Sequence, residues 1–266
     1  MILSKISTVS LAARLKTISL QLIALSLFSC NKTSNINANK SFVGLTHLAY
    51  NVPAIKLTLN GKDLFPDSLS FGNGTGYPGN PYDTTISQVS LMNILLAQDS
   101  SVIISGNAAF RQGAQYSIFF FDTLAATSAA VSLIILQDNP TIRTDTFTNY
   151  RYMNFSPGDT IWGLKLINNR NDIPYAADTV EIPPSVFVGL NNDPSEYPFS
   201  LIRSGNYKVF AFRDSSNPAP DRSNFDSLGN FQIDSLVNYY IYLQGFYGDT
   251  SALSPNKFQL KLKALN

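Results

Sequence analysis

Short apolar and aromatic runs without a helical repeat are the feature that most limits how this chain folds. In the final segment, FQLKLKALN, Phe258, Leu260 and Leu262 alternate with polar residues, which is the two-residue period of a half-buried β-strand. NILLAQ (93–98) fits a strand or a short helix, and the neighbouring VIISG (102–106) favours the strand. Similar runs bounded by turn residues are YSIFFF (116–121), VSLIIL (131–136), YKVFAF (207–212) and YYIYLQ (239–244). The sequence therefore predicts an all-β protein with little helix.

The composition allows a large core and argues against a nucleic-acid partner. Of the 266 residues, 44% are hydrophobic and 12% are aromatic, so a sizeable hydrophobic core can be buried. Only 14% are charged and the formal net charge is +1, which leaves no strongly basic face for binding phosphates.

The N-terminus has the pattern of a targeting segment. Lys5, Arg14 and Lys16 form a positive region, and an apolar stretch of about eleven residues, 18–28, follows it. That stretch is too short for a membrane-spanning helix, which needs about 20 apolar residues. The segment is therefore predicted to be a signal peptide.

The only cysteine follows this apolar stretch directly. Leu27, Phe28 and Ser29 precede Cys30, and the four residues resemble the lipobox of bacterial lipoproteins, whose cysteine is acylated and becomes the mature N-terminus. The resemblance implies attachment to the membrane through N-terminal lipid, palmitate included, at Cys30. The alternative is an ordinary signal peptide with an incidental cysteine.

If Cys30 carries lipid, the mature chain has no thiol for a disulfide, a metal site or a nucleophile. The segment NKTSNINANK (31–40) has no apolar periodicity and is typical of a flexible tether. We therefore predict a signal peptide at 1–29, a lipidated tether at 30–41 and folded structure from residue 42.

The folded part contains two pairs of similar segments. RQGAQYSIFFFD (111–122) aligns without gaps on DSLVNYYIYLQG (234–245), and LTHLAYNVPAIKLTLNG (45–61) resembles YRYMNFSPGDTIWGLKLINN (150–169). The ungapped alignment matches Tyr116 with Tyr239 and Ile118 with Ile241. The repeat predicts two β-sandwich domains, and a single large sandwich is the alternative.

These segments resemble the domain of unknown function 4397 family of bacterial envelope and secreted proteins. Its units open with a strand of the type Arg-Phe-Val-His-Ala-Ser-Pro, which RYMNFSP (151–157) fits with Asn154 at the histidine position. IKLTLNG (55–61) is similar to the second strand of the family, and QGAQYSIFFFD (112–122) is similar to a later one.

The first copy departs from that pattern, because Thr46 takes the arginine position and Ala49 takes the histidine position in our alignment. The resemblance implies two tandem immunoglobulin-like antiparallel β-sandwich domains, at 42–145 and 146–266, and implies no reaction.

The lipobox and these domains together look like a lipoprotein of the Bacteroidota, which implies an outer-membrane, lipid-anchored protein. The residues after Cys30 lack the acidic side chains typical of lipoproteins exported to the surface in those organisms, and Asn31 is not the aspartate that retains many proteobacterial lipoproteins at the inner membrane. Whether the protein faces the periplasm or the surface stays undecided.

The residues offer little catalytic chemistry. His47 is the only histidine and lies inside a predicted strand without a serine elbow, so we interpret it as a core residue. Zinc sites built on Cys or several His are excluded because the ligands are missing. We therefore predict no catalytic, cofactor-binding or metal-binding residues and no enzyme activity.

Two pairs of carboxylates stand in predicted loops. They are Asp193 with Glu196 and Asp214 with Asp221, which could bind Ca²⁺ but lack the regular spacing of a dedicated calcium loop. We interpret them as solvated turn residues. A carboxylate-based hydrolase is the less favoured alternative, since acids far apart in sequence can meet.

Two aromatic features are open to a binding interpretation. FGNGTGYPGNPYD (71–83) is glycine-rich but lacks the Gly-Lys-Ser/Thr ending of a phosphate loop, so we expect an exposed loop with Tyr77 and Tyr82 as contact residues. Trp162 could stack on a sugar, but core packing at the start of a strand is the preferred interpretation.

A recurring triplet of Asp, then Ser or Thr, then an aliphatic residue or Thr resembles an O-glycosylation signal of periplasmic Bacteroidota proteins; turn chemistry is the alternative. The triplets begin at Asp67, Asp83, Asp122, Asp159, Asp178, Asp226 and Asp234.

Together these patterns predict a membrane-anchored envelope lipoprotein that acts as a non-catalytic binding or structural module without a cofactor. Its partner is expected to be a glycan or an envelope protein. A glycan site predicts an exposed row of aromatic residues, whereas a protein partner predicts a larger apolar patch.

Overall fold

The computed structural model confirms the all-β prediction. Its β-strands are accompanied, in the described residues, by a single 3₁₀ helix, η1 (Pro194–Glu196). Residues 39–266 form one compact unit. The described residues are 40–75, 83–86, 89–122, 131–138, 146–157, 161–168, 179–190, 193–214, 226–245 and 257–265. The predicted signal peptide and Cys30 lie outside them, as does the tether up to residue 39; β1 already begins at Lys40.

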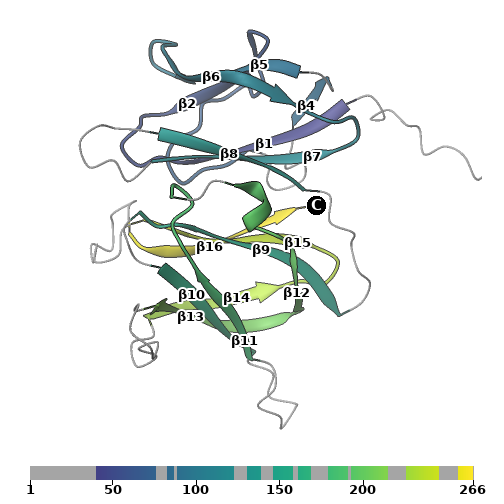
Figure 1. The fold of residues 1–266 in the computed structure, drawn as a ribbon, viewed down its shortest axis with the longest axis vertical. Coiled ribbons are helices and arrows are strands. Elements are labelled where there is room, and N and C mark those ends of the chain that lie inside the picture. The colour runs from purple at the N-terminus through teal and green to yellow at the C-terminus, as the bar shows by residue number, and fades with distance from the viewer. Residues whose placement is uncertain are drawn as a thin grey trace, which may run out of the picture. The chain divides into compact units, whose positions relative to one another are not determined.

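The N-terminal sandwich, residues 40–138, consists of two four-stranded sheets (Figure 1). The first has the order β4 (Asp83–Ile86), β1 (Lys40–Leu48), β7 (Gln115–Asp122), β8 (Val131–Gln137). The second has the order β3 (Lys62–Asp63), β2 (Ile55–Leu59), β5 (Val89–Leu96), β6 (Val102–Ala109). The ambiguous segment NILLAQ thus belongs largely to strand β5.

The C-terminal sandwich, residues 146–265, repeats this arrangement. Its first sheet has the order β12 (Ser200–Arg203), β9 (Phe147–Phe155), β15 (Asn238–Gln244), β16 (Gln259–Leu265). Its second sheet has the order β11 (Thr179–Ser185), β10 (Ile161–Asn168), β13 (Gly205–Asp214), β14 (Asp226–Ile233).

The sheets are rich in antiparallel pairs, as predicted, and among the described strands each sandwich contains one parallel pair. β1 runs parallel to β7, and β9 runs parallel to β15. A parallel pair needs a long crossover connection, and here the connection passes through strands of the opposite sheet. The first strand of each sandwich is therefore held centrally in its sheet, between two neighbours.

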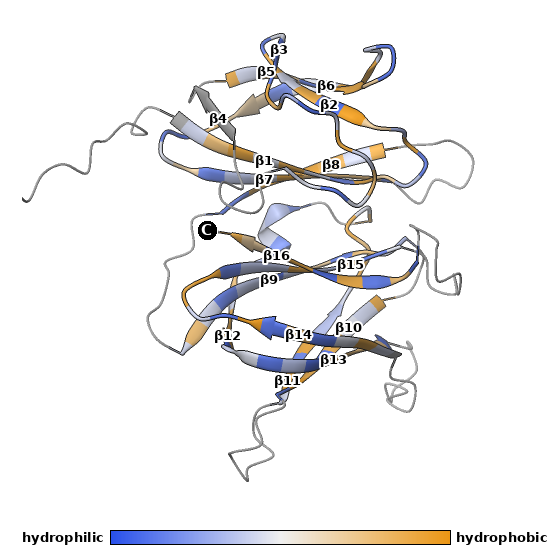
Figure 2. Ribbon diagram, turned by 180° about the vertical axis from the view of Figure 1, so that it is seen from behind, coloured by the Kyte–Doolittle hydropathy of each residue, from blue (hydrophilic) through white to orange (hydrophobic). Residues whose placement is uncertain are grey.

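Each sandwich has its own core, formed by the inward side of alternating residues. In β5, Ser90, Met92 and Ile94 are buried while Leu91 is exposed. Trp162 is only 1% exposed, and its ring lies 4.6 Å from that of Phe258, which confirms its interpretation as a core residue. Figure 2 shows apolar residues on strands of both sheets of the N-terminal sandwich, including β2 and β8.

A third hydrophobic cluster joins the two sandwiches. In β7, Ile118 and Phe120 face the N-terminal core, whereas Phe119 and Phe121 pack against residues of the C-terminal sandwich. The sheet containing β1 and the sheet containing β9 therefore cover each other, so that four sheets are stacked (Figures 1 and 2). The buried residues of this junction are Leu48, Phe119, Phe121, Ile134, Leu136, Met153, Phe155, Phe187, Val188, Tyr197, Tyr240, Tyr242 and Leu265.

A tyrosine hydrogen bond marks the same turn in both sandwiches and supports the predicted repeat. The backbone N–H of Arg111 donates to the Tyr116 hydroxyl over 2.9 Å, and that of Asp234 donates to the Tyr239 hydroxyl over 3.1 Å. A tyrosine hydroxyl bonded to backbone a few residues upstream is a hallmark of immunoglobulin-like sandwiches. The two tyrosines are thus equivalent in structure as well as in sequence.

The alignment of the first copy at the histidine position is wrong by two residues. The parallel registers place His47 beside Phe120 and Asn154 beside Leu243, which are equivalent positions of β7 and β15. His47, and not Ala49, is therefore the counterpart of Asn154. Both side chains also accept a hydrogen bond from the amide two residues later, over 3.2 Å for His47 Nδ1 and 3.0 Å for Asn154 Oδ1.

The arginine position shifts by the same two residues, so that Gly44 rather than Thr46 is the counterpart of Arg151. The physical reason is that both strands are apolar on both faces. Without a clear alternation of polar and apolar residues, sequence alone does not define the register of such a strand.

Candidate functional site

His47 is a core residue, as expected from the sequence. Its side chain is fully buried, and its ring lies 5.3 Å from that of Phe120. Nε2 is 3.1 Å from the carbonyl oxygen of Pro53. Burial lowers the pKa of the imidazole, because the charged form loses its hydration. The ring therefore fills space and satisfies backbone groups at the end of β1.

Of the carboxylates in the predicted loop pairs, Asp193 has a structural role within its own turn. Asp193 caps η1 by accepting hydrogen bonds from the N–H and the hydroxyl of Ser195, both over 2.9 Å, which lowers the pKa of its carboxyl. Glu196 is exposed in the same turn. Asp214 ends β13, and its predicted partner Asp221 lies outside the described residues. Within the described ranges no three His, Cys, Asp or Glu side chains gather as a metal site would require.

The beginning of the glycine-rich segment is bound to β1. The amides of Gly72 and Thr75 donate to the carbonyls of His47 and Leu45 over 2.8 Å each. A Cβ atom at Gly74 would lie 3.1 Å from Thr46 Oγ1 and 3.3 Å from the Leu45 carbonyl oxygen, so glycine suits this close approach to β1. Residues 71–75 are therefore an ordered edge of the sheet, whereas Tyr77 and Tyr82 lie outside the described residues.

The Asp-Ser/Thr triplets are partly described. Ser68, Thr179 and Ser227 are exposed, which is the accessibility that O-glycosylation needs. Asp122, in contrast, is buried, and burial raises the pKa of its carboxyl. Modification of the triplets remains a prediction.

An exposed row of aromatic residues would favour a glycan partner, and a continuous apolar patch would favour a protein partner. Among the strongly exposed large apolar side chains of the described residues, Phe147 is the one aromatic residue. Val89 and Leu91 of β5 are exposed side by side on one sheet of the N-terminal sandwich, but Val102 of β6 lies farther along and the exposed Asn107 is the cross-strand neighbour of Leu91. Neither an aromatic row nor a continuous apolar patch is formed by these residues.

Two open grooves of similar size are present in the described structure. One, of about 380 Å³, lies in the C-terminal sandwich beside β11 and is lined by Tyr150, Tyr152, Pro183 and Tyr197, among others. The Tyr152 hydroxyl donates to the carbonyl of Trp162 over 2.9 Å. Its polar group is thus already used inside the protein.

The second groove, of about 370 Å³, combines residues of both sandwiches, and we call it the junction groove. Its polar lining includes Thr46 and Thr75 from the N-terminal sandwich and Asp234, Tyr242, Lys261 and Lys263 from the C-terminal sandwich. We take the junction groove as the candidate functional site, because its polar groups come from both sandwiches and meet only where the two sandwiches pack together.

Lys263 reaches the groove from β16. Strand alternation turns Leu260 and Leu262 toward the C-terminal core and Lys261 and Lys263 toward the opposite side. From the sequence these lysines belong to the polar side of a half-buried strand, which is normally a solvated face. The stacking of the two sandwiches places that side against the N-terminal sandwich instead.

The ammonium group of Lys263 is poorly hydrated and has few partners. Nζ donates to Thr46 Oγ1 over 3.0 Å and lies 5.5 Å from the centre of the Phe119 ring. Burial lowers the pKa of Lys263 to about 8, and the negative charge of Asp138 partly opposes this shift. At neutral pH most of the amine is still protonated, so the groove carries a cation.

Tyr242 lines the groove next to this cation. Its ring belongs to the junction cluster, 5.8 Å from that of Phe119, and burial raises the pKa of its hydroxyl. Within the described part of the chain, the hydroxyl forms no hydrogen bond. Tyr242 is opposite Lys261 on the neighbouring strand and therefore diagonal to Lys263, a separation that long side chains bridge.

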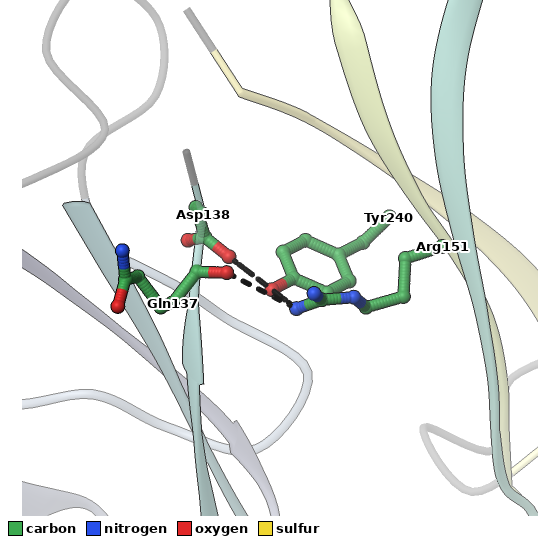
Figure 3. A network of polar contacts seen from close by, with 4 residues as sticks. All are labelled: Gln137, Asp138, Arg151 and Tyr240. Atoms are coloured by element: carbon green, nitrogen blue, oxygen red, sulfur yellow. Dashed lines mark hydrogen bonds and ion pairs between the residues drawn. The ribbon is translucent and has the colours of Figure 1, made fainter. Parts of the chain in front are cut away.

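A buried polar network lies elsewhere in the junction (Figure 3). Arg151 Nη1 donates to the Tyr240 hydroxyl over 3.0 Å, and this hydroxyl donates to Asp138 Oδ1. Arg151 Nη1 is also 3.8 Å from Asp138 Oδ1, and the guanidinium lies 4.1 Å from the centre of the Phe199 ring. The side chains of Arg151, Tyr240 and Asp138 thus bond to one another and link the two sandwiches.

No model of a known protein family matches the chain, and no curated protein is significantly similar to it. In the residues that the structure describes, no helix is both long enough and apolar enough to cross a membrane. The similarity to the domain of unknown function 4397 family therefore stays a prediction from the strand motifs.

Proposed function

We propose that this protein is a lipid-anchored lipoprotein of the cell envelope whose two β-sandwiches act as one rigid, non-catalytic binding module. The observation that carries the proposal is the junction. Phe119 stacks on Phe155 and meets Tyr240 edge-on, each at 5.0 Å between ring centroids. Aromatic packing of this kind, with a buried ion pair beside it, supports one rigid body instead of two freely moving domains.

The use of the acidic side chains supports a non-catalytic role. Asp138 accepts from Tyr240 and pairs with Arg151, and Asp63 lies 3.6 Å from Lys56 Nζ. Asp193 caps η1. A carboxylate-based hydrolase instead needs two acids about 5 to 10 Å apart in a cleft, one of them with an altered pKa. The lining of the junction groove includes a single acid, Asp234, in its described part.

The anchoring part of the proposal rests on the lipobox at Cys30 and is tested by metabolic labelling. The full chain is produced in a bacterium supplied with alkyne-tagged palmitate, beside the Cys30→Ala variant. The wild type is expected to carry the label and to sediment with the outer membrane, and the variant to lose both properties. An unlabelled wild type, or equal labelling of both, would contradict the anchor. Protease treatment of whole cells then separates a surface-facing from a periplasmic location.

A further inference from the structure

The ammonium of Lys263 lacks a counter-ion among the described residues. It has three N–H donors, of which Thr46 Oγ1 accepts one, and its other contact is the ring of Phe119. Within the described ranges no carboxylate lies within ion-pair distance of Nζ. Asp138 acts on it only at longer range, because its carboxylate is held by Arg151 and Tyr240.

The fold itself does not require a cation at this position. Tyr240 pairs with Lys263 in the C-terminal sandwich, and its counterpart Ser117 pairs with Leu136 in the N-terminal sandwich. Leu136 is buried, 1% exposed, and belongs to the junction cluster. An apolar residue thus fills the equivalent position, whereas a partly buried ammonium loses hydration. Lys263 thus occupies a position that an apolar residue fills in the N-terminal sandwich.

The other charges of the groove favour a ligand with one negative charge. Lys261 lies two residues from Lys263 on the same side of β16 and adds a second cation. Asp234 is the acid of the lining, and its carboxylate already accepts hydrogen bonds from Gln232 Nε2 over 3.1 Å and from the Tyr239 hydroxyl over 3.4 Å. Lys261, Lys263 and Asp234 together give the described lining a net charge of +1, which a ligand with one negative charge neutralises.

We propose that the junction groove binds a small organic carboxylate, with the Lys263 ammonium as the principal contact and with Tyr242 and Lys261 beside it. The two oxygens of a carboxylate can accept from the remaining N–H groups of Lys263 and from the O–H of Tyr242, which have no acceptor among the described residues. A groove of about 370 Å³ is within the size range of small-molecule sites, roughly 300–1,000 Å³. This inference rests on the proposed function as a binding module and names the class of its ligand.

The test is calorimetric titration of the full chain in non-ionic detergent. D-glucuronate and D-glucose are compared because they have the same ring and differ in the carboxylate, while acetate and inorganic phosphate serve as further probes. We expect glucuronate to bind at least tenfold more tightly than glucose and more tightly than phosphate. If acetate binds as tightly as glucuronate, the carboxylate alone is recognised. If acetate binds more weakly, the sugar ring contributes as well, and either result agrees with the proposal.

Two variants locate the binding and control for loss of one positive charge. Lys263→Met is expected to weaken glucuronate binding at least tenfold. Lys208→Met is expected to bind like the wild type, since Lys208 is an exposed residue of β13 that also contacts an aromatic ring, Phe210 at 5.1 Å. Circular dichroism checks that both variants are folded. For the wild type, affinity should be constant from pH 6 to 7 and fall above about pH 8, as Lys263 loses its proton.

Several results would overturn the proposal. They are absence of glucuronate binding, equal affinity for glucose, tighter binding of phosphate, and unchanged affinity of a folded Lys263→Met variant. Such a failure would concern the groove alone, because anchoring is measured separately through palmitate labelling of Cys30.

Discussion

Phe119 tests whether the two sandwiches are packed together in solution. Its side chain is fully buried between the sandwiches and contacts the rings of Phe155, Tyr240 and Tyr242. Truncation of a buried phenylalanine removes its transfer free energy and leaves a cavity, together about 3–5 kcal/mol. We expect Phe119→Ala to reduce the free energy of unfolding by that amount.

The matched control is Phe120→Ala, since Phe120 is the next residue of β7, is equally buried and faces the N-terminal core. Urea unfolding is followed by intrinsic tyrosine and tryptophan fluorescence and by circular dichroism. Both variants should lose about 3–5 kcal/mol, but Phe119→Ala alone should separate unfolding into two steps, because it weakens only the contact between sandwiches. A loss below about 1 kcal/mol for Phe119→Ala, with the control strongly destabilised, would refute the junction.

Three further predictions concern single side chains. Arg151→Met should reduce the free energy of unfolding, measured in urea, by about 3–5 kcal/mol, because it leaves Asp138 buried without its cation. Adding Asp138→Asn to the same chain should recover part of this loss, and no recovery would speak against the ion pair. Because the pKa of His47 is lowered in the folded state, the contribution of this neutral imidazole to the free energy of unfolding should be complete above about pH 6.5 and decrease below it, by at most about 1.4 kcal/mol per pH unit. In thermal unfolding at several pH values, His47→Asn should flatten this slope. An unchanged slope would show that another group causes it. Leu236 has a φ of 65°, which strains a leucine, so Leu236→Gly should raise the free energy of unfolding by about 1 kcal/mol. Gly113 has a φ of 71° at the equivalent turn of the N-terminal sandwich, so Gly113→Ala should lower the free energy of unfolding. A destabilised Leu236→Gly variant would show that the contacts of the leucine side chain outweigh the strain.

The sequence was most informative where one strand pattern had one interpretation. The alternation in FQLKLKALN correctly predicted strand β16, and the short run VSLIIL correctly predicted β8. The ungapped match of Tyr116 with Tyr239 predicted two positions that share the same hydrogen bond in the structure. These signals are local, because period, turn residues and segment length do not depend on distant contacts.

The sequence was less informative where a strand is apolar on both faces. The sequence predicts IFFF in β7 and YYIY in β15 as strands of a sandwich core, but half of their side chains pack between the two sandwiches. A strand that is buried on both faces lacks alternation, so the unbroken apolar run of these segments is the one sequence signal of burial on both faces. The same lack of alternation explains why the counterparts of Asn154 and Arg151 were misplaced by two residues.

The candidate site depended even more on tertiary structure. Lys263 and Thr46 are 217 residues apart, and their hydrogen bond exists only because β16 and β1 belong to sheets that face each other. In the sequence, Lys263 is an ordinary polar residue of a half-buried strand. Its lowered pKa arises from the loss of hydration in the junction, which no local pattern encodes.

By itself, the sequence determined the all-β class, the internal repeat and the absence of any thiol besides Cys30, because these follow from residue types and short-range periodicity. Only the tertiary structure decided which face of each apolar strand meets the other sandwich, and hence where Arg151, Asp138 and Lys263 lie. The period of a strand shows that it has two faces, but the partner that covers each face is chosen by packing between distant segments.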